Sequence, residues 1–162
     1  MRHILLLITV LLSTVCGALA LSAQTTVSLD GFQSDPEASV EMLADRLTVS
    51  QKDGAVRFEG NVVIAQGDIR LSADLVDVTY LEAGGIGRLS ASGSVLLVSP
   101  SDTAQADSAV YDFSARELRM RGNVLLNQGA ISLSADLLTI DLETGGAVME
   151  GRVRTVLPSG SK

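Results

Sequence analysis

Apolar and polar residues alternate with a period of two along most of the chain beyond residue 40. Around the first glycine of this pattern the apolar positions are Val56, Phe58, Val62 and Ile64. A period of two places the apolar side chains on one face of a β-strand. No stretch beyond the N-terminal apolar run shows the 3.6-residue period of an amphipathic helix. The pattern therefore predicts an all-β domain.

The alternation belongs to an internal repeat. Residues 60–78 return as residues 122–140 with eleven of nineteen positions identical. Two markers recur through the chain: a glycine at Gly60, Gly93, Gly122 and Gly151, and the aspartate of an Ala-Asp pair at Asp45, Asp74, Asp107 and Asp136. The alanine of each pair follows the preceding glycine marker by thirteen residues. It precedes the next glycine marker by sixteen residues, or by twenty in the copy where residues 82–87 carry an insertion. The repeat unit is therefore 29 residues long, which indicates stacked copies of one small motif.

The apolar phase slips by one position after each Ala-Asp pair, so that apolar residues resume at Leu47 and Val49 in the first copy and at Val76 and Val78 in the second. A strand must bend there to keep one face inward. We expect an open stack of short antiparallel strands whose first and last rungs, residues 40–49 and 148–156, have unpaired edges. The edge residues are Val40, Met42, Val153, Thr155 and Val156, and Val153 is expected inside the final strand.

Composition excludes several classes of function. The chain carries 12 Lys and Arg against 19 Asp and Glu, a net charge of −7, which argues against nucleic acid as a partner. His3 and Cys16 are its one histidine and one cysteine, so a His/Cys metal site, a Cys/His nucleophile and a Ser-His-Asp triad all lack their parts. We predict that the protein is not an enzyme and needs no cofactor or metal.

The N-terminus predicts export. Arg2 precedes an apolar run from Ile4 to Leu12, and small residues follow, as in a signal peptide that is cleaved after Ala23 or, alternatively, after Ala20. Residues 4–23 are also long enough for an uncleaved membrane anchor. We expect a cleaved signal peptide at 1–23, a flexible segment at 24–39, the β-domain at 40–158 and a tail at 159–162.

Two groups of charged residues have competing interpretations. The four repeated aspartates resemble a carboxylate cluster for a cation, but a short carboxylate at a repeated corner is better explained as an acceptor of backbone N–H bonds. Arg116, Arg119 and Arg121 suggest a phosphate-binding patch. However, Arg119 and Arg121 alternate with apolar residues, which predicts that they face solvent.

The tract from Phe58-Glu59-Gly60-Asn61-Val62-Val63-Ile64 through Ala73-Asp74, with its second copy at residues 121–136, resembles the OstA-like family. The resemblance covers residues 40–158. It implies a V-shaped open β-jellyroll whose hydrophobic interior receives the lipid A acyl chains of lipopolysaccharide. It also implies a periplasmic bridge that carries lipopolysaccharide from the inner to the outer membrane. In such a bridge, chains stack head to tail, with an LptC-like inner-membrane partner at the N-terminal edge and an LptD-like outer-membrane partner at the C-terminal edge.

The resemblance places interior positions at Val40, Met42, Tyr111 and Phe113, and alternation adds further inward residues. The expected lipid-binding residues are Val40, Met42, Val49, Phe58, Leu71, Val78, Tyr111, Phe113 and Met120. From the residues alone, these side chains fit a closed core equally well. Two other functions remain open: a membrane-anchored LptC-like component of the same pathway, and a self-assembling structural β-solenoid without lipid cargo.

Overall fold

The computed structural model describes residues 25–32, 38–50 and 54–157. The predicted signal peptide, with Cys16, lies outside these residues. The strands are β1 (Thr25–Ser28), β2 (Val40–Leu43), β3 (Arg46–Val49), β4 (Val56–Gln66), β5 (Ile69–Tyr80), β6 (Ile86–Val98), β7 (Asp102–Asp112), β8 (Glu117–Gln128), β9 (Ile131–Asp141), β10 (Gly146–Glu150) and β11 (Arg154–Val156), and a 3-10 turn, η1 (Asp30–Phe32), follows β1. The prediction of an all-β fold is confirmed.

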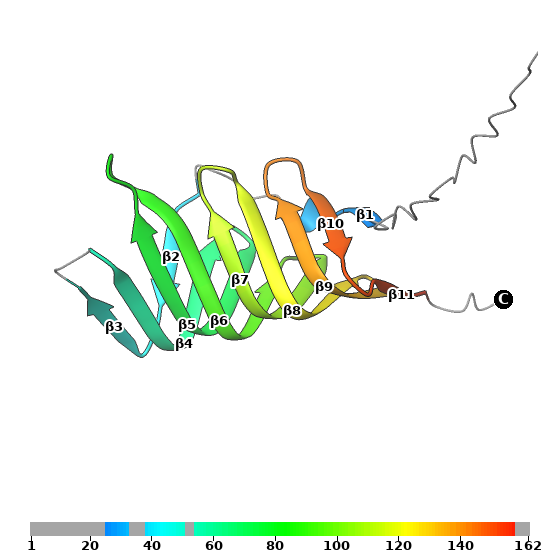
Figure 1. The fold of residues 1–162 in the computed structure, drawn as a ribbon, viewed down its shortest axis with the longest axis horizontal. Helices are drawn as coiled ribbons and strands as arrows, with labels where there is room; N and C mark the ends of the chain where they lie inside the picture. The colour runs from blue at the N-terminus through cyan, green and yellow to red at the C-terminus, as the bar shows by residue number, and fades with distance from the viewer. Residues whose placement is uncertain (1–24, 33–37, 51–53, 158–162) are drawn as a thin grey trace, which may run out of the picture.

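All strands belong to one antiparallel sheet, and each long strand pairs with its neighbour in sequence (Figure 1). The order is β1-β10-β9-β8-β7-β6-β5-β4-β2, with β3 also paired to β4 and β11 to β9. The sheet does not close on itself, because β2 and β3 both pair with β4 and with no strand on their other side within the described residues. The predicted open stack of antiparallel strands is confirmed.

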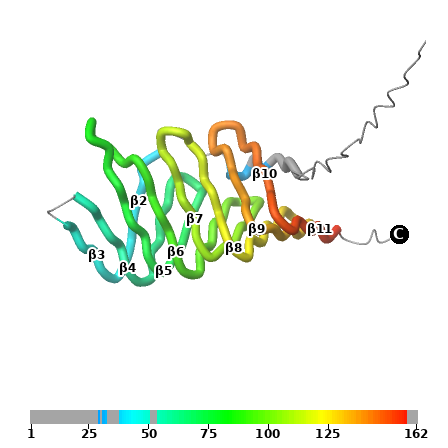
Figure 2. Tube along the Cα trace, in the orientation of Figure 1, coloured from blue at the N-terminus to red at the C-terminus, as the bar shows by residue number. Residues whose placement is uncertain are grey.

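Every long strand is interrupted by a shift of register near its middle. In the β4–β5 pair, for example, pairing shifts between Glu59 and Val62, opposite Ala73-Asp74. The strands bend at these bulges, as the tube in Figure 2 shows. The line of bends divides the sheet into two halves that face each other, which we call leaves. The β2 leaf comprises residues 40–43, 62–66, 69–73, 95–98, 102–106, 124–128, 131–135 and 154–156, and the β3 leaf comprises residues 25–28, 46–49, 56–59, 75–80, 86–92, 108–112, 117–121, 137–141 and 146–150.

The repeated glycine and the residue after it form each corner between the leaves. Gly60 has φ +77° and Asn61 has φ +45°, a left-handed conformation that asparagine tolerates better than most side chains. The Asn61 side-chain amide donates to Asp45 Oδ2 at 2.8 Å, and the Asp45 N–H donates to the Gly60 carbonyl at 2.9 Å. This corner explains the spacing of the two markers, since the glycine and the aspartate meet on neighbouring strands.

The role predicted for the repeated aspartates needs correction. We expected their carboxylates to accept backbone N–H bonds, but side chains donate to three of them, Asp45, Asp107 and Asp136. Asp107 accepts from Asn123 at 2.9 Å, and Asp136 accepts from the Arg152 guanidinium at 3.0 and 3.1 Å through Nε. At these three corners the bend places the residue after the glycine beside the carboxylate of the neighbouring strand, and the side chain of that residue donates the hydrogen bond.

The core lies between the leaves and is almost wholly aliphatic. Along β8 the inward residues Leu118 and Met120 are buried, whereas Arg119 and Arg121, which alternate with them, are exposed. The predicted alternation therefore holds, and it explains how a chain with only 3% aromatic residues fills its interior.

The two ends of the chain differ from expectation. Residues 24–39 were expected to be a flexible segment, yet β1 within them pairs with β10. Alternation gave no signal there because the four residues of β1, Thr-Thr-Val-Ser, include a single apolar side chain. Val153 was expected inside the final strand and in fact precedes β11, where it packs partly buried against the core.

Candidate functional site

An apolar cavity lies in the interior between the leaves. It contains about 610 Å³ of space free of protein atoms, part of it open solvent. Six lining residues come from the β2 leaf or its edge and six from the β3 leaf or its edge: Val40, Ile64, Gln66, Ile69, Leu71 and Leu97, and Leu89, Ala91, Ala109, Tyr111, Leu118 and Leu142. None of the twelve side chains is charged. The site is therefore suited to binding apolar matter without covalent chemistry.

The two polar groups of the cavity lie at defined places. The Gln66 side-chain amide donates to the Ala38 carbonyl at 3.3 Å, which holds it at the edge of the β2 leaf. The Tyr111 ring packs on Phe113 with 4.2 Å between ring centroids and 35° between ring planes. These two aromatic rings stiffen the β3 leaf at the end of β7, where it meets the solvent.

The structure separates the expected lipid-binding residues into four groups. Val40, Leu71 and Tyr111 line the cavity, and Met42, Phe58 and Phe113 pack against the core while remaining partly exposed. Val78 and Met120 are buried among other core residues, at 2% and 0% exposure. Val49 is 60% exposed on β3, outside the enclosed interior.

Sequence reasoning missed several lining residues. Ile64, Leu89 and Leu97 line the cavity, and they share the inward phase of their strands with residues that were chosen. Alternation alone identifies these three positions. Leu142 lies in the turn after β9, where no strand periodicity exists, so its contribution follows only from the fold.

The interior is more open toward the N-terminal end. Val40, Met42 and Phe58 are partly exposed there, whereas toward the C-terminal end Leu126 and Met149 are fully buried. The exposed large apolar residues of the N-terminal rung are Leu43, Leu47 and Val49, at 68%, 56% and 60%. At the opposite end, Val156 and Leu157 are exposed at 52% and 66%. Both ends of the sheet thus carry apolar side chains beside a strand edge.

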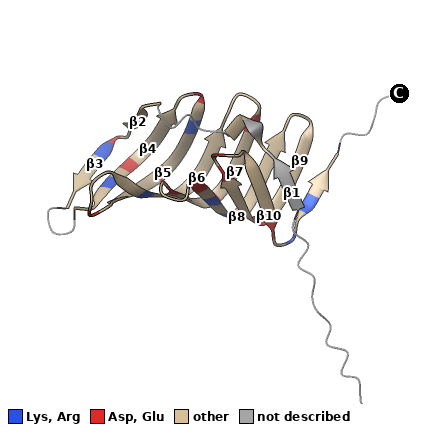
Figure 3. Ribbon diagram, turned by 90° about the horizontal axis from the view of Figure 1, so that it is seen from above, with Lys and Arg blue, Asp and Glu red and all other residues tan. Residues whose placement is uncertain are grey.

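Figure 3 shows by colour where charged residues lie along the strands, and those that alternate with inward apolar residues, such as Arg57 and Arg119, are exposed. Arg57 donates to Asp77 across β4 and β5 at 2.7 Å, and Arg88 contacts Asp112 across β6 and β7 at 3.2 Å. The side-chain bond to Asp77 raises the pKa of Arg57. Such exposed pairs contribute little to stability, but they keep the outer surface solvated.

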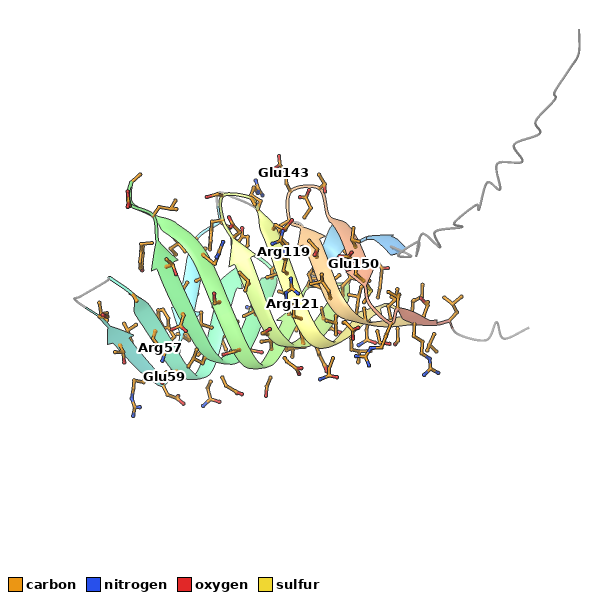
Figure 4. All side chains as sticks on the ribbon, in the orientation of Figure 1. Arg57, Glu59, Arg119, Arg121, Glu143 and Glu150 are labelled. Atoms are coloured by element: carbon orange, nitrogen blue, oxygen red, sulfur yellow. The ribbon has the colours of Figure 1, made fainter. Side chains whose placement is uncertain are left out.

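Two of the three arginines considered as a phosphate patch, Arg119 and Arg121, are on this outer surface, and Arg116 is partly buried in the turn between β7 and β8. Figure 4 labels Arg119 and Arg121 on β8, both exposed. Arg119 is paired with Glu117 at 2.6 Å. The outward direction predicted for both residues is confirmed, and neither lines the cavity.

Other kinds of site find no support in the described part of the chain. Residues 25–32, 38–50 and 54–157 contain no group of three or more His, Cys, Asp or Glu side chains placed to hold a metal ion. Across the same ranges, no helix has the length and apolar character needed to cross a bilayer.

A family model decides the identity of this fold. The LptA/(LptD N-terminal domain) LPS transport protein family matches residues 41–146. The chain belongs to this family. The OstA-like resemblance and the open β-jellyroll it implied are thereby confirmed.

Two individual proteins are similar to the chain. An uncharacterized protein of Rhizobium meliloti (strain 1021) is 25% identical over 162 residues, covering 93% of this chain and 87% of that protein. The crystal structure of LptH from Pseudomonas aeruginosa superposes with a TM-score of 0.68 at 16% identity, covering 78% of this chain and 99% of LptH. LptH is described as the LptA-homologous periplasmic component of the conserved lipopolysaccharide transport device. At this level of identity, the likeness to LptH establishes the fold.

Proposed function

We propose that this member of the family is a periplasmic bridge protein that shields the lipid A acyl chains of lipopolysaccharide between its leaves and carries the lipid from the inner to the outer membrane. The apolar cavity, whose lining comes from both leaves and carries no charged side chain, is the observation that carries the proposal. A cavity walled by both leaves and open toward one end offers an acyl chain an environment from which water is largely excluded.

The physical chemistry of the walls suits transport better than storage. Each methylene group that leaves water for an apolar interior gains about 0.8 kcal/mol. The cavity walls are aliphatic apart from Gln66 and Tyr111. Such walls hold an acyl chain without fixing its position, so the lipid slides along the groove. No acid, base or nucleophile is required, and the proposed function is not enzymatic.

The lipid-binding set under this proposal is the one expected from sequence, with graded roles. Val40, Leu71 and Tyr111 contact the acyl chains directly in the cavity. Met42, Val49 and Phe58 extend the apolar track toward the N-terminal edge. Val78, Phe113 and Met120 support the walls or contact the lipid when the leaves separate.

Both ends of the sheet would bind other chains by adding strands. At the N-terminal edge, Val40 and Met42 on β2 would receive the LptC-like partner. At the C-terminal edge, Val153, Thr155 and Val156 would meet the LptD-like partner or the N-terminal edge of another copy. Strand addition satisfies unpaired backbone groups, and because the two edges differ, head-to-tail contacts form open arrays.

Export is part of the proposal. A signal peptide at residues 1–23 would be removed on entry to the periplasm. The mass of the protein isolated from its native membrane fraction checks this step. A mass that includes Met1 would favour the anchored, LptC-like alternative instead.

Photo-crosslinking tests the lipid-binding proposal. A photoreactive amino acid at Val40, Leu71 or Tyr111 should capture lipopolysaccharide, because these positions line the cavity. The matched controls are Arg57, Asp77 and Arg119, which carry their ion pairs on the outer faces. Equal capture by both sets would overturn the proposal.

A structural β-solenoid remains the second candidate because apolar residues flank both strand edges. The two candidates differ in their cargo. A solenoid forms filaments of the same length with or without lipopolysaccharide, and the lipid does not copurify with it.

A further inference from the structure

Two residues outside the strands fill the interior between the leaves. Leu29 follows β1 and Phe32 ends η1, and both are 0% exposed. They are the largest side chains among those that are fully buried in the described residues, and they belong to the same core as the inward residues of the strands. A four-residue stretch of irregular chain therefore supplies apolar groups that the repeats do not.

This stretch crosses the open side of the molecule from one leaf to the other. The Leu29 N–H donates to the Gly145 carbonyl at 2.7 Å, in the turn at the edge of the β3 leaf. Gly31 lies against the side chains of Ser99, Ser101 and Asp102, in the turn at the edge of the β2 leaf. In Figure 1 the segment is the blue piece behind β10, on the side away from the bulges.

The segment begins where the cavity ends. Leu142, which lines the cavity, lies in the same β9–β10 turn as Gly145. On the other leaf, Leu97 lines the cavity from β6, and Ser99 follows directly after that strand. Leu29 and Phe32 thus occupy the groove next to the cavity, toward the C-terminal end.

The β6–β7 turn against which Gly31 packs contains a buried polar atom without a hydrogen-bond partner among the described residues. Asp102 is only 2% exposed, and its Oδ1 has no hydrogen-bond partner among the described residues. Its Oδ2 accepts from the Ser101 hydroxyl at 2.6 Å. A buried carboxylate oxygen without a partner disfavours the closed arrangement. Withdrawal of Gly31 from this turn would expose the Asp102 carboxylate to water. The buried carboxylate therefore favours release of residues 29–32 from the turn.

We propose that residues 29–32 form a displaceable plug, and that an acyl chain of the cargo replaces Leu29 and Phe32 between the leaves. The inference rests on the proposed lipid-binding function and deepens it. In the plugged state the groove receives lipid only in the cavity, whose lining runs from β2 to β8 and reaches Leu142 in the β9–β10 turn. A groove continuous from the N-terminal to the C-terminal edge, which a bridge requires, exists only after the plug leaves.

A disulfide that locks the plug tests this inference. Gly31→Cys and Ser101→Cys bring two cysteines together, in a full chain whose single native cysteine is removed by Cys16→Ser. A Cβ at position 31 would overlap the Ser101, Asp102 and Ser99 side chains, so this turn must shift to accept it, and the reduced double variant is the reference for the oxidised one. A photoreactive amino acid at Leu126, beyond the plug, reports lipopolysaccharide in the C-terminal part, and one at Leu71 reports the cavity. Oxidation should lower capture at Leu126 by about tenfold while leaving Leu71 unchanged, because a locked plug removes the binding-competent state. Reduction should restore capture, and each single cysteine variant is the control.

The outcomes separate the two proposals. Equal capture at Leu126 with the disulfide formed and with it reduced would overturn the plug. Absence of capture at Leu71 in the unmodified chain would instead overturn the lipid-binding function.

A second variant keeps the plug testable without lipopolysaccharide or a disulfide. Phe32→Ala should tighten binding of a fluorescent twelve-carbon fatty acid by about threefold or more, since the ligand no longer expels the ring. Tyr80→Ala is the matched control, because Tyr80 is an aromatic residue 49% exposed and away from the plug. Unchanged or weaker binding by Phe32→Ala would contradict the plug.

Discussion

Asp74 lies directly over Gly93 on the neighbouring strand. A Cβ on Gly93 would come within 2.8 Å of the Cβ of Asp74, and Gly93 has φ +77°. The same pairing recurs at the other corners, between Asp45 and Gly60, Asp107 and Gly122, and Asp136 and Gly151. Each pair fixes the place where the sheet turns from one leaf to the other. The groove between the leaves therefore depends on these four contacts.

Gly93→Ala should destabilise the domain by about 2–4 kcal/mol, because both a left-handed backbone and a close contact become unfavourable. Urea denaturation followed by circular dichroism measures the change. Gly129→Ala is the control, since Gly129 has φ +56° but no atom within 4 Å of the added Cβ. It should cost only about 1–2 kcal/mol. Equal costs at the two positions would show that the contact with Asp74 is unimportant.

The last corner should respond to acid. The Arg152 guanidinium, mainly through its side-chain hydrogen bonds, holds the pKa of Asp136 below its ordinary value. A carboxyl group with a lowered folded pKa stabilises the fold above its unfolded pKa and loses that effect as the pH falls through the folded value. We therefore expect the β9–β11 corner to loosen below about pH 4, as measured by NMR of the Asp136 carboxyl and nearby amides.

Arg152→Asn provides the matched variant for this titration. It recreates the asparagine found at Asn61 and Asn123, which also tolerates a positive φ. The three guanidinium hydrogen bonds to Asp136 are replaced by that of a neutral amide, so the pKa of Asp136 should rise toward its ordinary value. An unchanged titration would assign the lowered pKa to another cause.

An acidic residue in the cavity should weaken lipid binding. Leu71→Glu places a carboxylate where an acyl chain would cover it, and desolvating that charge should reduce lipopolysaccharide affinity by about tenfold or more. Arg70→Glu introduces the same residue on the exposed face of the same strand. Binding to immobilised lipopolysaccharide at fixed ionic strength compares the two. A larger loss for Arg70→Glu would place the lipid on the outer surface.

Proline in β11 should interrupt assembly at the C-terminal edge. Thr155→Pro removes a backbone donor and distorts a three-residue strand that pairs with β9. Sedimentation velocity should show weaker association with rising concentration, while capture of lipid at Leu71 is retained. Thr155→Val, which keeps the N–H, should associate as the unmodified chain does. A chain that stays monomeric at every concentration without any substitution would favour a soluble shuttle over a bridge.

Much of the site follows from alternation, and its exceptions have physical causes. Val40, Leu71 and Tyr111 were identified because inward positions recur every second residue along a strand. Val49 shares that phase but is exposed, because β3 is the outer rung and has β4 on one side only. Periodicity reports which face a residue occupies and does not report whether another strand covers that face.

The amino-acid sequence was enough to identify the all-β class, the repeat, the inward phase and the family, because each depends on local spacing of residue types. The three-dimensional fold was needed to show that Asp45 bonds with Asn61, that β1 pairs with β10, and that Leu29 and Phe32 lie between the leaves. These contacts join residues far apart in the chain. These contacts form only when the two bent leaves face each other, and no local pattern of apolar and polar residues specifies how the leaves are placed.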